Sequence, residues 1–67
     1  MDKHEIELKY HIILKSESKA LEYRERADEC AAYGDRIGVS YWTVKARERE
    51  AIADAVKQSL LWDVAAI

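Results

Sequence analysis

The chain contains no proline, only two glycines and a single cysteine among its 67 residues. One thiol, Cys30, cannot build the disulfide framework that staples small secreted folds. The shortage of proline and glycine excludes collagen-like and Pro/Gly-rich disordered chains, while 49% apolar residues favour a packed core. No apolar run approaches the length of a bilayer-spanning helix, so we expect no membrane association. The lone thiol and the charged N-terminal residues favour a cytoplasmic location.

Net charge is low, and no chemistry-bearing cluster is evident. Eleven basic and 13 acidic side chains are interspersed and give a net charge of −2, so no overall positive field attracts nucleic acid. His4 and His11 are seven residues apart, too far to share a metal without further ligands. Cys30 lies in an alanine-rich stretch, where a free thiol acts as a small apolar group. The sequence therefore predicts no enzyme, no metal and no cofactor.

The apolar residues of the chain can form only a small hydrophobic core. Ten of the apolar residues are alanines, and only fifteen are Val, Ile or Leu. Ordering the chain costs on the order of 100 kcal/mol at about 1.5 kcal/mol per residue, which such a core barely offsets. Without disulfides or metals, self-association is the remaining way to stabilise a chain of this size, so we predict a homodimer.

Gly34 and Gly38 are the main turn-forming residues of the chain. Before them, Ala20, Tyr23, Ala27 and Cys30 recur at spacings of three and four, which predicts a helix that ends near residue 33, with Gly34 after its last turn. After them, the pattern predicts a loop over 34–39 and a second helix over 40–64 with Ser40 as its N-cap. Ile52, Val56, Leu60 and Val64 fall every fourth residue and form its predicted apolar stripe.

Residues 5 to 15 permit two interpretations. Ile6, Leu8, Tyr10, Ile12 and Leu14 alternate with polar residues, the period of a strand. Ile6, Tyr10 and Ile13 also fit the heptad frame of the helix that follows, and no turn residue intervenes. The favoured fold is all-α, a single domain over 1–67 in which an antiparallel helical hairpin pairs into a dimeric bundle. The alternative is an α+β fold with a strand at 5–14.

Two aromatic positions and their neighbours are candidate contacts with a partner. Tryptophan is costly to expose and is favoured as an interface anchor. Trp62 lies beside Leu61, away from the predicted Ile52–Leu60 stripe. We therefore predict dimer or partner contacts at Tyr23, Trp42, Leu61 and Trp62.

The string GVSYWTV at Gly38–Val44 resembles the turn and recognition-helix start of helix-turn-helix DNA-binding domains. The resemblance implies a turn at Gly38, a cap at Ser40 and a small transcription regulator. Its DNA contacts would be Tyr41, Trp42, Lys45 and Arg49. Arg47 stands where that family usually buries an apolar residue, so the DNA-binding interpretation ranks second to protein binding.

The stretches ALEYRERADECAAYGDRIG and SYWTVKAREREAIADAV resemble the small helical accessory proteins from early regions of temperate lambda-like bacteriophages. That resemblance implies a non-enzymatic protein–protein interaction module, acting on a host factor in the bacterial cytoplasm by helix-face recognition. The identity of the protein partner does not follow from the sequence.

Overall fold

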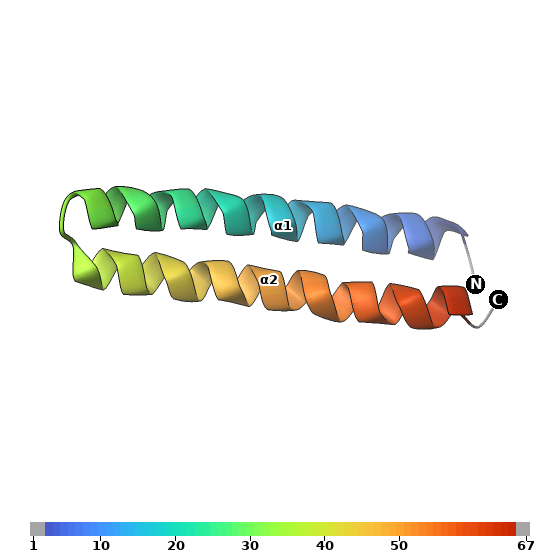
Figure 1. The fold of residues 1–67 in the computed structure, drawn as a ribbon. Coiled ribbons are helices and arrows are strands. Elements are labelled where there is room, and N and C mark those ends of the chain that lie inside the picture. The colour runs from blue at the N-terminus through green and yellow to red at the C-terminus, as the bar shows by residue number, and fades with distance from the viewer. Residues whose placement is uncertain (1–2, 66–67) are drawn as a thin grey trace.

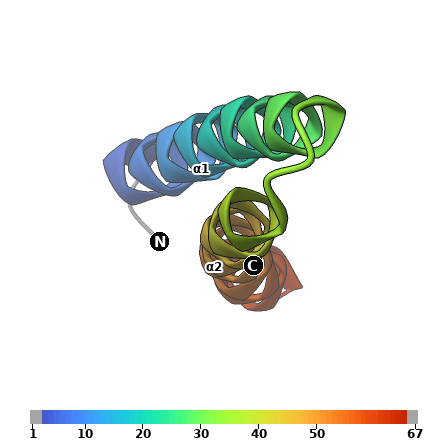
Figure 2. The ribbon, with the colours of Figure 1, turned by 90° about the vertical axis from the view of Figure 1, so that its left-hand side faces the viewer.

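The computed structural model describes residues 3–65, which form two long α-helices packed antiparallel as a hairpin. Helix α1 spans Lys3–Ala32 and helix α2 spans Arg36–Ala65 (Figure 1). The Cα trace extends 50 × 15 × 11 Å, so the molecule is a rod, and no third element covers either helix within the described residues (Figure 2). The predicted all-α hairpin is confirmed. The first helix ends at Ala32, close to the predicted position.

The connection between the helices is shorter than the predicted loop at 34–39. Gly34 has a φ of 74°, and its N–H and that of Asp35 donate to the carbonyls of Ala31 and Cys30, which closes α1 as a Schellman motif. The Asp35 carboxylate then accepts a hydrogen bond of 2.9 Å from the Gly38 N–H. Asp35 is therefore the N-cap of α2, in place of Ser40, and the helix begins four residues earlier than predicted.

The strand alternative at 5–14 is wrong, because these residues belong to α1. The residues that meet α2 follow a helical period rather than an alternation, since Ile13 and Ser16 are buried and Ile6 is half-buried. The alternating apolar residues Leu8 and Leu14 remain exposed. Within the described residues no strand is present to pair with this segment, whereas α2 offers a helical surface along its whole length.

Small side chains line the seam between the helices. Ala20 and Ala27 of α1 and Ala46 and Ala53 of α2 are each buried, and Ile13 is the one large apolar side chain among the buried described residues. The spacing of seven within each helix keeps the alanines on one face, so the two backbones can approach closely. Close approach brings dispersion contacts but removes little apolar area from water.

Interhelical ion pairs mark the register of this seam. Lys9 pairs with Asp63 near the termini, and Glu17 pairs with Lys57 further along. Arg24 contacts Glu50 with its Nη2 at 2.6 Å and its Nε at 2.7 Å. Hydrogen bonding to Glu17, and then the charge of that carboxylate, raise the pKa of Lys57. Ion pairs that solvent reaches contribute little each, but the order of these pairs along the rod agrees with the antiparallel arrangement.

Candidate functional site

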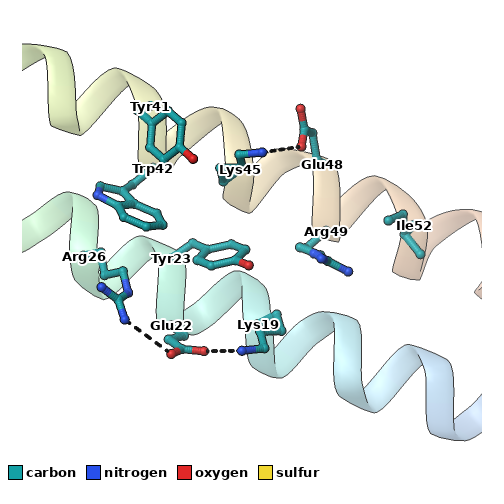
Figure 3. A pocket seen from close by; sticks show the side chains of 10 residues that line it. All are labelled: Lys19, Glu22, Tyr23, Arg26, Tyr41, Trp42, Lys45, Glu48, Arg49 and Ile52. Atoms are coloured by element: carbon teal, nitrogen blue, oxygen red, sulfur yellow. Dashed lines mark hydrogen bonds and ion pairs between the residues drawn. The ribbon is translucent and has the colours of Figure 1, made fainter.

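One groove on the rod gathers most of the side chains that the sequence singled out. It has a volume of about 570 Å³ and lies between α1 and the first half of α2 (Figure 3). It is lined by aromatic, basic and acidic side chains and by one isoleucine. These are Lys19, Glu22, Tyr23, Arg26, Tyr41, Trp42, Lys45, Glu48, Arg49 and Ile52. We call this surface the aromatic groove.

Trp42 joins the aromatic side chains of the groove. Its ring centroid lies 5.5 Å from that of Tyr23 on the other helix and 4.9 Å from that of Tyr41, which meets it edge to face. The Arg26 guanidinium lies 5.0 Å from the centre of the Trp42 ring, and Lys45 Nζ lies 5.6 Å from that of Tyr41. These contacts hold a half-buried tryptophan between the helices, with one cation over its ring and a second over the neighbouring Tyr41.

Basic groups outnumber acidic ones in the aromatic groove by four to two. Glu22 accepts from Lys19 at 3.1 Å and lies 3.8 Å from Arg26, so one carboxylate balances two cations. Lys45 Nζ lies 4.0 Å from Glu48 Oε2. Arg49 has no ion-pair partner among residues 3–65. The groove is therefore a local positive region on a chain of net negative charge.

A second surface lies at the end of the rod opposite the loop, where α1 begins and α2 ends (Figure 1). Seven of the exposed large apolar side chains of the described residues gather there. They are Leu8, Tyr10, Ile12, Leu14, Leu61, Trp62 and Val64, and we call this surface the apolar end. Trp62 is 76% exposed and Leu61 is 63% exposed.

A shallow groove crosses one side of the apolar end. Tyr10, Leu14 and Leu61 form its walls, and Ile13 and Leu60 complete its apolar lining. Its volume is about 340 Å³, and the Glu17–Lys57 ion pair closes it towards the middle of the rod. An adjoining hollow of about 370 Å³ shares Tyr10 and Leu14 and continues to Ile6. The two hollows together form one mainly apolar strip that runs along α1 and crosses to α2 at Leu60 and Leu61, with Glu7 and His11 also lining its α1 part. We call this surface the apolar strip.

Cys30 lies near the loop, away from both surfaces. Desolvation, the charges of Asp35 and Glu29, and a hydrogen bond to Asp35 raise the pKa of this thiol. A raised pKa keeps the thiol protonated and makes it a poor nucleophile. No group of three His, Cys, Asp or Glu side chains that could hold a metal occurs in residues 3–65. Neither helix, in the described part of the chain, is long and apolar enough to cross a bilayer.

The structure thus separates the predicted contact residues into two places. Tyr23 and Trp42 lie against each other with tilted rings in the aromatic groove, and Tyr41, Lys45 and Arg49 line the same groove. Leu61 and Trp62 lie at the apolar end, far along α2.

The turn expected at Gly38 from the helix-turn-helix resemblance lies inside the first turn of α2. The described residues hold two helices where that family has three.

Sequence reasoning did not identify Arg26 and Lys19 as members of the aromatic groove, because they come from the opposite helix. It also did not identify Leu8, Tyr10, Ile12 and Leu14 as an exposed surface. The signal was available in their pattern, since apolar residues on two separate sides of a helix indicate that more than one neighbour covers it. Compared with known proteins, the chain matches no family model, and no curated protein or solved structure matches it significantly.

Proposed function

We propose that this chain is a non-enzymatic protein–protein interaction module that binds its partner through the apolar end. The observation that carries the proposal is the exposure of large apolar side chains on two sides of α1 at this end, with Leu8 and Ile12 on one side and Tyr10 and Leu14 on the other. Leu8, Tyr10, Ile12 and Leu14 are two residues apart, and each step of two rotates the side chain by about 200°. All four are exposed, so α2 alone cannot cover this part of α1.

The composition of the rod changes sharply along its length. Ten of the 18 residues at 3–14 and 60–65 are large apolar residues, and five are charged. In the middle of the rod, at 15–29 and 45–58, four of 29 are large apolar residues and sixteen are charged. Contiguous apolar surface on a small protein, next to a solvated charged segment, is typical of an interaction site.

Site-specific photo-crosslinking tests this function. A benzophenone side chain is placed at Trp62 or Tyr10, and at the exposed Glu25 in the charged middle as the matched control. Irradiation of the purified chain and of bacterial cells that produce it should give discrete adducts from the two apolar-end positions and none from Glu25. Adducts of equal intensity from all three positions, or no discrete adduct from Trp62 and Tyr10 in either sample, would contradict the proposal.

The resemblance to phage accessory proteins leads us to propose a host factor as one partner of the module. A rod with an apolar end and a charged middle suits this role, because the apolar end can bind the partner while the charged middle stays in solvent. Mass spectrometry of the adducts formed in bacterial cells identifies the partner, and an adduct formed only with unrelated abundant proteins would argue against a specific host factor.

DNA binding through the aromatic groove is a second candidate function. Four cations line the groove with Trp42, against two carboxylates, and this balance favours an anionic ligand there. Replacement of Lys45 and Arg49 by alanine should then abolish gel retardation of mixed-sequence DNA at low salt. A wild-type chain that retards no DNA under these conditions would remove this candidate.

A further inference from the structure

We propose that the partner seated on the apolar strip is a second copy of this chain, so that two hairpins join by their apolar ends about a twofold axis. The inference rests on the proposed function and names the partner. In such a dimer Tyr10, Leu14 and Leu61 of one copy pack against the same side chains of the other. The charged middles and loops then point away from the junction.

The accessible surface of the chain supports a partner of this size. A globular protein of 7.8 kDa exposes about 4400 Å², whereas this chain exposes 5270 Å². The excess of about 900 Å² is close to the roughly 800 Å² that each subunit contributes to an interface of standard size. One dimer contact is therefore enough to bring the buried fraction to that of an ordinary small domain.

The charge of the apolar end favours association between like copies. Residues 3–14 and 60–65 contain two lysines and three acidic residues, and Lys9 is already paired with Asp63. Two such ends can approach without strong repulsion, because neither sign dominates. The aromatic groove, by contrast, carries four cations against two carboxylates, and two copies joined there would bring like charges together.

The small amount of large apolar surface inside a single hairpin also supports a second copy as the partner. Its buried apolar residues are one isoleucine and four alanines, so it removes little large apolar surface from water. Within the described residues no large side chain is fully buried. Chains of this size need a further source of stability, and the strip formed by Tyr10, Leu14 and Leu61 provides it only when it is covered.

Sedimentation equilibrium on three variants of the full chain tests the dimer and its face. Leu14→Glu and Leu61→Lys put a charge into the strip, and Leu21→Glu makes the same kind of change in the charged middle. All three leucines are more than half exposed in a single copy, so the substitutions act on contacts between copies. We expect the wild type and Leu21→Glu to have twice the monomer mass, and the two strip variants to dissociate at least about 30-fold more readily.

Thermal unfolding of the wild type gives an independent measurement, even if the strip variants fail to fold. A folded state that exists only as a dimer should gain about 5 °C in Tm for each tenfold increase in concentration between about 1 and 100 μM. A helical wild-type monomer with a constant Tm overturns the inference, as does a dimer that persists in both strip variants or is lost equally in Leu21→Glu. If that monomer still gives adducts with another protein from Trp62, the inference fails and the proposed function stands.

Discussion

Replacing Ala46 by leucine tests the claim that alanines set the distance between the helices. Ala46 is 0% exposed, and its side chain faces α1 within the seam. Leucine adds three carbon atoms where no space is left, and such overpacking costs about 1 to 3 kcal/mol. Alanine and leucine have similar helix propensities, so the change in the free energy of unfolding reports packing between the helices. For a domain of this size the expected loss in Tm is about 5 to 20 °C.

The control for this substitution is Ala51→Leu, in the same helix but on its exposed side. It should change stability by less than about 0.5 kcal/mol, because the added carbons remain in solvent. Circular dichroism at one fixed protein concentration measures both melts and keeps any contribution from self-association equal. An Ala46→Leu chain as stable as the wild type, or an Ala51→Leu chain equally destabilised, would refute the close alanine seam.

Three further substitution series probe the loop and the thiol. Gly38→Ala should lower Tm although alanine is the better helix former, because its Cβ would clash with the Asp35 carboxylate that caps α2 and would lie 2.6 Å from Cys30 Sγ. The added change Cys30→Ala removes the second clash and should restore part of the loss in thermal melts. Gly34→Ala should cost about 1 to 2 kcal/mol through its positive φ alone, since nothing lies within 4 Å of the new Cβ, and Gly34→Asn should cost less. The rate of Cys30 alkylation, measured against pH, should have its midpoint above the ordinary thiol pKa. Asp35→Asn should lower that midpoint, because it removes a negative charge while keeping a side chain that can cap the helix. An unchanged midpoint would exclude Asp35 as a cause of the raised pKa.

Local chemistry was sufficient to predict that two helices form and where the first one ends. Gly34 adopts the left-handed conformation that a C-terminal glycine supplies. The start of the second helix was predicted wrongly because two residues could cap it. Asp35 caps it, and Ser40 lies inside it. The choice between them depends on how tightly the two helices must turn, and that is a tertiary constraint absent from the local sequence.

The predicted stripe of α2 was only half correct. Val56 and Leu60 are half-buried, but Ile52 and Val64 are exposed. A spacing of four advances about 40° around the helix at each step, so the stripe leaves the seam within a few turns. The seam instead follows alternating steps of three and four, as the first helix was predicted to do, and it passes through Ala53. The stripe was predicted from large aliphatic residues, whereas the residues of α2 that are buried in the seam are alanines.

The candidate site shows the same division between local and tertiary information. Tyr41, Trp42 and Lys45 are neighbours on one helix, so their shared surface could be predicted from spacing. Arg26 and Tyr23 join them only because Asp35 fixes the register of the two helices. Once the cap is known, counting outward from the loop in both directions brings these residues opposite Trp42.

The proposed binding at the apolar end links stability to binding in this rod. The alanine seam and the ion pairs set the geometry of the hairpin, but they bury little large apolar surface. Seven of the 13 exposed large apolar side chains of the described residues are at the apolar end, and a partner that covers this end removes them from water. A partner that binds the folded hairpin and not the unfolded chain stabilises it by mass action. Substitutions at Leu14 or Leu61 therefore lower apparent stability in proportion to the binding they remove, while substitutions at Ala46 or Ala53 lower the stability of the hairpin itself.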